Sequence, residues 1–167
     1  MTIKHISLAL LLLSLAWTGC KKDDAGTDPN PTLAAHAILP GEGIKEVRIG
    51  DAAQVAIDLF GTPFPSNASV NGVYTHYLVY VSKGVVVYCE PTTESTFNAQ
   101  MKIASLDLSA PFDGKTEKGI GIGSSKAEVK AAYGDPVTSS QFFGDEYAIG
   151  ITFVYDGADK VESIVVE

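Results

Sequence analysis

Two stretches of this chain match at a constant offset of 73 residues, and this internal repeat constrains the fold more than any other feature. Residues 47–63 read VRIGDAAQVAIDLFGTP, and residues 120–136 read IGIGSSKAEVKAAYGDP. The correspondence continues without a gap through Tyr74 and Tyr147 to Gly84 and Gly157. A unit that recurs in sequence at one spacing predicts a supersecondary unit that recurs in the fold.

Each copy carries the signals of one short helix. A turn glycine precedes each helix, and Asp51 in the first copy and Ser124 or Ser125 in the second can accept the first free amide hydrogens as N-caps. Gln54 and Glu128 lie at capping-box spacing after Asp51 and Ser125. A glycine followed two residues later by a proline then ends each helix, because the proline cannot continue it. These signals predict helices over residues 51–60 and 124–133.

Apolar and aromatic runs after each helix predict antiparallel strands, separated by turns at Lys83-Gly84 and at residues 156–160. The predicted fold class is therefore α+β, with two tandem repeats that each pack a short helix on an antiparallel sheet. Repeat 1 spans residues 36–117 and repeat 2 spans residues 118–167. The predicted strands cover residues 74–82, 85–90 and 97–106 in repeat 1 and residues 147–155 and 161–166 in repeat 2.

The run Val47-Arg48-Ile49-Gly50, ten residues, and then Gly61-Thr62-Pro63 before an aromatic hairpin resembles the SmpA/BamE family of small outer-membrane lipoproteins. The tandem arrangement is similar to that of the β-lactamase inhibitor protein. Both resemblances imply a domain that binds another protein. They assign no contact residues, because the shared motif consists of caps and turns. Two copies and an export signal set this chain apart from the SmpA/BamE family.

The N-terminus has the features of a bacterial lipoprotein signal. A nearly unbroken apolar run of 12 residues, from Ile6 to Trp17, suits a signal-peptide core but is too short to span a membrane. Small residues then precede Cys20, as in a lipobox, so residues 1–19 are predicted to be a signal peptide and Cys20 to be acylated. Residues 20–35 are predicted to form a flexible tether. A plain secretory peptide is the alternative.

The charged residues after Cys20 resemble the export signal that sends Bacteroidota lipoproteins to the outer face of the outer membrane; they are Lys21, Lys22, Asp23 and Asp24. The alternative is a solvated tether. A net charge of −8 argues against nucleic-acid binding and against attraction to an anionic bilayer. Attachment to lipid is therefore expected through the acylated cysteine alone.

No residue pattern indicates catalysis, a cofactor or a metal. Beyond the signal peptide the chain has only His36 and His76, and no carboxylates accompany them at metal-ligand spacing. A thiolate pair of His76 with Cys89 is a remote alternative. The glycines at positions 119, 121 and 123 lack the spacing of a nucleotide-binding loop. The chain is therefore predicted not to be an enzyme.

Aromatic residues are the candidates for binding. Tyr74 and His76 share one strand face, Tyr77 lies on the other, and Phe142 and Phe143 stand together in a loop. Exposed aromatic residues are typical interface anchors. The predicted function is a non-catalytic protein-binding module on an outer-membrane, surface-exposed lipoprotein, with an envelope or extracellular protein as partner. Two alternatives stay open, a glycan- or small-ligand-binding accessory protein and a passive structural component.

Overall fold

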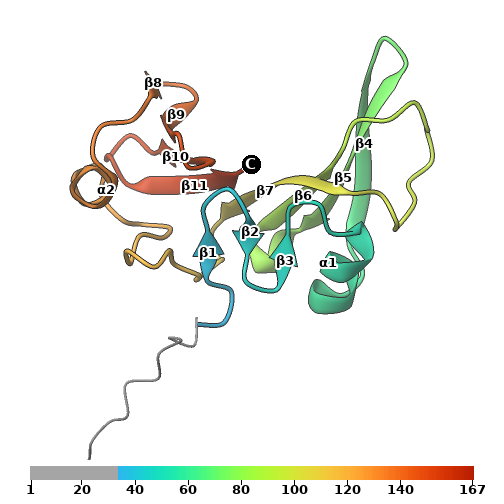
Figure 1. The fold of residues 1–167 in the computed structure, drawn as a ribbon, viewed down its shortest axis with the longest axis horizontal. Coiled ribbons are helices and arrows are strands. Elements are labelled where there is room, and N and C mark those ends of the chain that lie inside the picture. Colours follow the sequence, from blue (N-terminus) through green and yellow to red (C-terminus); the bar gives the residue numbers. More distant parts are fainter. Residues whose placement is uncertain (1–33) are drawn as a thin grey trace, which may run out of the picture. The chain divides into compact units, whose positions relative to one another are not determined.

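An antiparallel sheet of eight strands is the main element of the structure (Figure 1). The computed structural model describes residues 34–167, so the predicted signal peptide, Cys20 and the charged run 21–24 lie outside the described residues. The strands follow one another across the sheet in the order β4 (Phe64–Val70), β5 (Val73–Tyr80), β6 (Val85–Cys89), β7 (Ile103–Ser109), β11 (Val161–Val166), β10 (Ile151–Tyr155), β9 (Gly144–Tyr147) and β8 (Thr138–Ser140).

Smaller elements cover one face of this sheet. A second sheet has three two-residue strands, β1 (Ile38–Leu39), β2 (Gly43–Ile44) and β3 (Val47–Arg48). The helices of the described residues are α1 (Ala53–Phe60), α2 (Lys126–Tyr133) and the 3-10 turn η1 (Val81–Lys83). Among the described residues, none of these helices has the length and apolar character to cross a bilayer.

The predicted fold of two repeats, each with a helix on its own sheet, is wrong. The structure is mostly β, and strands from both predicted repeats join in one sheet. The junction is the pairing of β7 with β11, in a register that runs from Ser109↔Ser163 to Leu106↔Val166. An unpaired strand edge leaves backbone N–H and C=O groups without partners. Pairing the last strand of each half satisfies both edges and merges the two cores.

The correspondence between the two halves holds through the helices and then fails. α1 and α2 lie at the offset of 73 residues, but Val81 lies in η1 whereas its counterpart Val154 lies in β10. The predicted single strand over residues 147–155 is likewise divided, because a turn separates β9 from β10. The amide of Gly50 donates to Ile103 O and that of Gly123 to Val161 O. The strand residues that bond the two helix-entry turns, Ile103 in β7 and Val161 in β11, are therefore closer in sequence than the 73 residues that separate the turns.

The predicted strand over residues 97–106 is wrong in its first part, since β7 begins only at Ile103. The preceding loop instead caps α1 with backbone carbonyls: Ala53 N donates to Met101 O, and Gln54 N donates to Ala99 O, each at 2.8 Å. For this reason the N-cap residue Ala52 needs no side-chain bond. The expected cap Asp51 instead accepts a hydrogen bond from the amide of Arg48 at 2.8 Å.

The core lies between the eight-stranded sheet and the elements that cover it. A row of paired residues crosses six strands and is buried throughout; its members are Leu78, Val87, Leu106, Val166, Ile151 and Tyr147. The helices add small side chains, and the three-stranded sheet adds Ile38, Ile44 and Val47. Close packing of this one face leaves the opposite face of the sheet uncovered.

Candidate binding surface

The uncovered face of the sheet carries a second row of paired residues, one position along from the buried row. Its central members are only half-buried, in contrast to the fully buried core row. We call this surface the open face and define it by Phe64, Val79, Val86, Asp107, Val165 and Thr152, with Tyr77 and Tyr88 in the neighbouring row. Most of its side chains are apolar or aromatic, although no element of residues 34–167 covers them.

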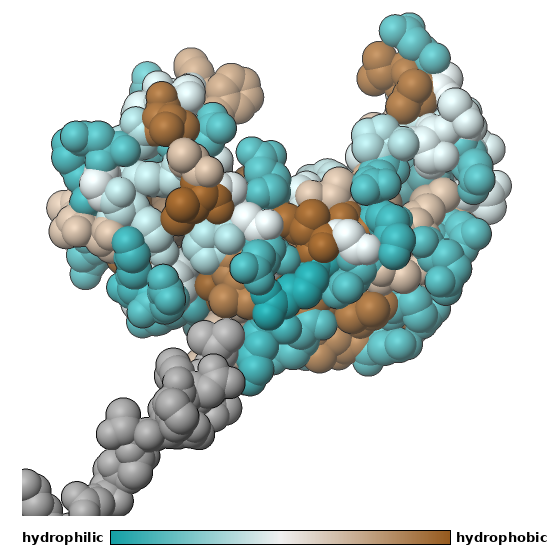
Figure 2. Space-filling model, in the orientation of Figure 1, coloured by the Kyte–Doolittle hydropathy of each residue, from teal (hydrophilic) through white to brown (hydrophobic). Residues whose placement is uncertain are grey.

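The open face is hollowed. Figure 1 shows that the β4–β5 hairpin and the β8–β9 hairpin rise on one side of the central strands β7 and β11. The space-filling view of the same orientation shows a hollow between these raised ends (Figure 2). Helix α1 and the three-stranded sheet lie on the other side of the central strands (Figure 1). A concave, partly apolar face of this kind can receive a convex partner.

Asp107 lies near the middle of the open face, between two valines. Val86 of β6 pairs with it on one side and Val165 of β11 on the other. Its Oδ1 is shielded from solvent and has no hydrogen-bond partner among the described residues. Burial raises the pKa of this carboxyl, and a hydrogen bond with Ser163 opposes that rise only in part. Burial also raises the pKa of nearby Tyr88, and the charge of Asp107 raises it further.

Phe142 and Phe143 occupy the turn between β8 and β9, at one raised end of the sheet. Their exposed fractions are 84% and 78%, so neither closes the core. The amides of both residues donate to the hydroxyl of Ser140, at 3.2 and 3.3 Å, which fixes the shape of the turn. Val70 and Val73 stand exposed at the tip of the other raised end. Apolar side chains therefore flank the hollow at both ends.

The three other candidate residues lie on different faces. Tyr77 belongs to the open face, where its ring contacts that of Tyr88 at a centroid distance of 5.6 Å. His76 is buried on the core side, and its Nε2 lies 2.8 Å from the carbonyl oxygen of Glu94. Tyr74 stacks beside His76 at the rim and exchanges two backbone hydrogen bonds with Thr92. His76 is therefore a structural residue, and Tyr77 is the one tyrosine of the candidate set on the open face.

No family model, curated protein or solved structure matches this chain. The chemistry of the site therefore rests on its geometry alone. Sequence reasoning missed Asp107 as a member of the site, although a signal was present. It is the only acidic residue in the alternating strand IASLDLS, at a position that the strand period assigns to the face opposite Leu106 and Leu108.

The buried thiol of Cys89 is not an activated nucleophile. Burial raises its pKa to about 11, whereas a reactive thiolate needs a lowered pKa. Cys89 is a member of the hydrophobic core. Within residues 34–167, no three His, Cys, Asp or Glu side chains are grouped so that they could hold a metal ion.

A polar cavity of about 370 Å³ lies beside the β8–β9 turn. The buried carboxylate of Asp145 stands next to it, accepts a hydrogen bond from Ser139 at 2.5 Å and pairs with Lys126 at 3.2 Å. The Lys126 ammonium also lies 4.7 Å from the centre of the Tyr155 ring. Asp145 and Lys126 neutralise each other, and the lining adds the hydroxyl groups of Ser139 and Ser140 and the carboxylates of Asp156 and Asp159.

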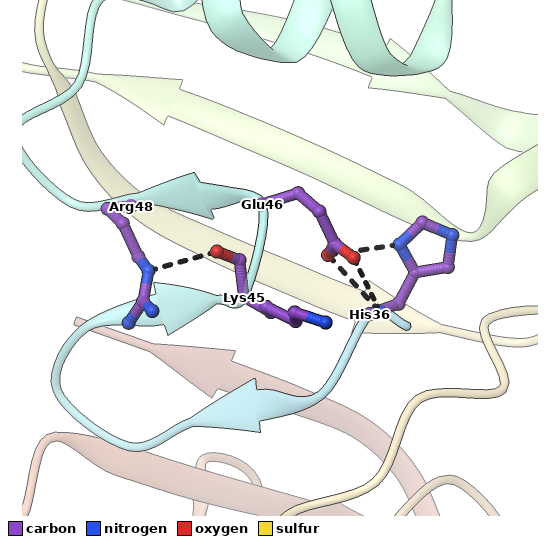
Figure 3. Close-up of polar contacts among 4 residues, drawn as sticks. All are labelled: His36, Lys45, Glu46 and Arg48. Carbon is purple, nitrogen blue, oxygen red and sulfur yellow. Dashed lines mark hydrogen bonds and ion pairs between the residues drawn. The ribbon is translucent and has the colours of Figure 1, made fainter. Parts of the chain in front are cut away.

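A second polar cluster fixes the start of the described chain. The Glu46 carboxylate accepts hydrogen bonds from the backbone amide of His36 at 3.1 Å, and one of its oxygens lies 3.3 Å from His36 Nδ1 (Figure 3). Burial would raise the pKa of Glu46, but these contacts with His36 outweigh burial and lower it. The His36 ring lies between Phe60 and Phe112, at 6.2 Å from each. This cluster ties residue 36 to the turn between β2 and β3.

Proposed function

We propose that this chain is an exported lipoprotein, anchored through acylated Cys20, that binds an envelope or extracellular protein without catalysing a reaction. Its binding surface is the open face together with Phe142 and Phe143. The outer leaflet of the outer membrane is the proposed location, on the strength of the charged run that follows Cys20. The observation that carries the proposal is the pair of exposed phenylalanines beside an uncovered, partly aromatic sheet face.

Physical reasons favour a protein partner. Aromatic residues supply a large share of binding free energy at protein interfaces, and a bare apolar patch on a stable domain marks such an interface. The described chain begins beside β1, on the side of the sheet away from the open face (Figure 1).

The test is crosslinking in whole cells that express the tagged full chain. We expect one reproducible protein crosslink in the wild type and at least a fivefold loss in the double variant Tyr77→Ala/Phe143→Ala, since such anchors contribute about 1 kcal/mol or more each. Val81→Ala is the matched control, because Val81 is 77% exposed but lies in η1, outside the open face. Undiminished crosslinking in the double variant contradicts the proposal. Cys20→Ala should release the protein from membranes in the same cells.

A second candidate function is the binding of a small polar ligand such as a glycan. The polar cavity beside the β8–β9 turn favours it, because several hydroxyl and charged groups converge there. The same cells separate the two functions. A glycan-binding protein would give no protein crosslink, and its attachment to glycans would be weakened by Lys126→Ala and unaffected by Phe143→Ala.

A further inference from the structure

We propose that the partner of the open face presents an arginine side chain, whose guanidinium group pairs with Asp107 and packs beside Tyr88. This inference rests on the proposed function and adds the chemistry of the contact. It begins from the Oδ1 atom of Asp107, which is shielded and has no hydrogen-bond partner among the described residues. A carboxylate with one shielded, unpaired oxygen is costly in the free protein. Asp107 as a residue is only half-buried, so a cationic donor at its exposed side would lower this cost.

The charge of the sheet requires that the donor come from the partner. None of the eight strands, all within the described residues, contains a lysine or an arginine. The same strands contain four acidic residues, Asp107, Asp145, Glu146 and Glu162. Of these, Asp145 is already paired with Lys126. Asp145 pairs with the core residue Phe153, whereas Asp107 and Glu146 share the row of the open face through Val165 and Thr152. Neither Asp107 nor Glu146 forms an ion pair with another described residue, so a cationic partner complements this face.

Two other occupants fit less well. A second copy of the chain, placed face to face, would bring Asp107 and Glu146 against the same acidic side chains, and like charges across an interface are unfavourable. A bilayer with anionic headgroups would be repelled for the same reason. A segment of a basic protein satisfies both the charge and the apolar surroundings.

Arginine suits the site better than lysine. Its planar guanidinium group can donate two parallel hydrogen bonds to a carboxylate and can stack on an aromatic ring at the same time. Asp107 and Tyr88 are close enough for the carboxylate charge to raise the tyrosine pKa. Val86 and Val165 on either side of Asp107 give the apolar part of the arginine side chain a surface to cover.

The test uses the full-length protein in nonionic detergent with its valine methyl groups labelled for NMR. The probe is the capped tripeptide Gly-Arg-Gly, compared with its lysine and citrulline versions. We expect saturable shifts of the Val86 and Val165 methyl signals with the arginine peptide. Affinity should fall about fivefold with citrulline, which is isosteric and uncharged, and in Asp107→Asn. Asp113→Asn, which removes one exposed charge outside the sheet, should leave the affinity unchanged.

Two results would overturn the inference. One is equal affinity for the arginine and citrulline peptides. The other is an unchanged affinity for the arginine peptide in Asp107→Asn, once thermal unfolding has shown that this variant is folded. The Phe143→Ala variant separates this inference from the proposed function. It should keep the arginine response while it loses the protein crosslink. If the protein crosslink depends on Phe143 but the arginine peptide causes no shifts, only the arginine contact is refuted. If the arginine peptide binds but no protein crosslink depends on Phe143, only the protein-binding function is refuted.

Discussion

Asp107 is a single carboxylate among apolar side chains, and this position has a thermodynamic consequence of its own. Ionising a half-buried carboxyl is less favourable in the folded protein than in the unfolded chain, where water surrounds it. Burial accordingly raises the pKa of Asp107 above its ordinary value of 3.8. Its charge therefore lowers the stability of the free protein, while the same charge is available to a cationic partner.

The sign of this effect can be measured with Asp107→Asn. The pKa of Asp107 is higher in the folded protein than its ordinary value of 3.8. The protonated group therefore contributes fully to the free energy of unfolding below pH 3.8, and this contribution is lost as the pH rises through the folded-state pKa. We expect Asp107→Asn to be more stable than the wild type at about pH 8, by roughly 1 kcal/mol because the site is partly exposed. The difference should shrink toward zero at about pH 3.

Urea unfolding of both proteins at the two pH values tests this prediction. Asp113→Asn is the matched control, since it removes one carboxylate from an exposed position. A destabilised Asp107→Asn at about pH 8, or a difference that does not change with pH, would contradict the assigned environment of the carboxyl.

At the scale of elements, the two helices begin in different ways although their sequences correspond. α2 has a complete capping box, as the sequence predicts: the Ser125 hydroxyl accepts the amide of Glu128, and the Glu128 carboxylate accepts the amide of Ser125. α1 has no side-chain cap, and the carbonyls of the loop before β7 accept its first amides. A helix of eight residues depends on such contacts, because its own propensity is insufficient.

Ser125→Ala removes the side-chain cap of α2 and leaves the amide of Glu128 without its partner. We expect a loss of about 1 kcal/mol in the free energy of unfolding. Ser69→Ala, at an exposed position in the edge strand β4, should change the stability by less than about 0.5 kcal/mol. Urea unfolding measures both, and equal stability of the two variants would show that α2 does not depend on its cap.

The elements that the sequence predicts well are those that local signals define. The ends of α1 and α2 follow from a glycine and a proline within three residues of each other, which act on the backbone directly. The sequence predicts a strand in the loop before β7 because Phe97 and Met101 alternate with polar residues. These side chains pack against the core from a loop whose backbone carbonyls accept the first amide hydrogens of α1. Such a use of the backbone has no local sequence signature.

At the scale of the whole described domain, the pairing of β7 with β11 was the feature that the sequence could not predict. Residues 106–109 and 163–166 are far apart in the chain, and nothing in either strand specifies the other as its neighbour. The sequence also does not predict whether Phe142 and Phe143 are exposed, since phenylalanines in a loop can close a core or extend from it. The strand period predicts Tyr77 on the face opposite Tyr74 and His76, and the structure confirms this.

The shared sheet predicts one cooperative unfolding transition for both halves. Ile164 of β11 is buried and pairs with Leu108 of β7, so Ile164→Ala should cost roughly 3 kcal/mol. Hydrogen exchange should then show the same loss of protection in β5, from the first half, as in β10, from the second. Unchanged protection of β5 beside a weakened β10 would mean that the halves unfold as separate units.

The seam between β7 and β11 also sets the order in which the sheet can be completed. During synthesis, strands β4 to β7 can pair as soon as residue 109 has left the ribosome. The second edge of β7 stays unpaired until residues 161–166 have also been made. During that interval a strand that ends up in the middle of the sheet is an open edge, able to pair with any extended segment nearby. The risk of misassociation through this edge therefore belongs to the period of synthesis and folding, and it ends when β11 pairs with β7.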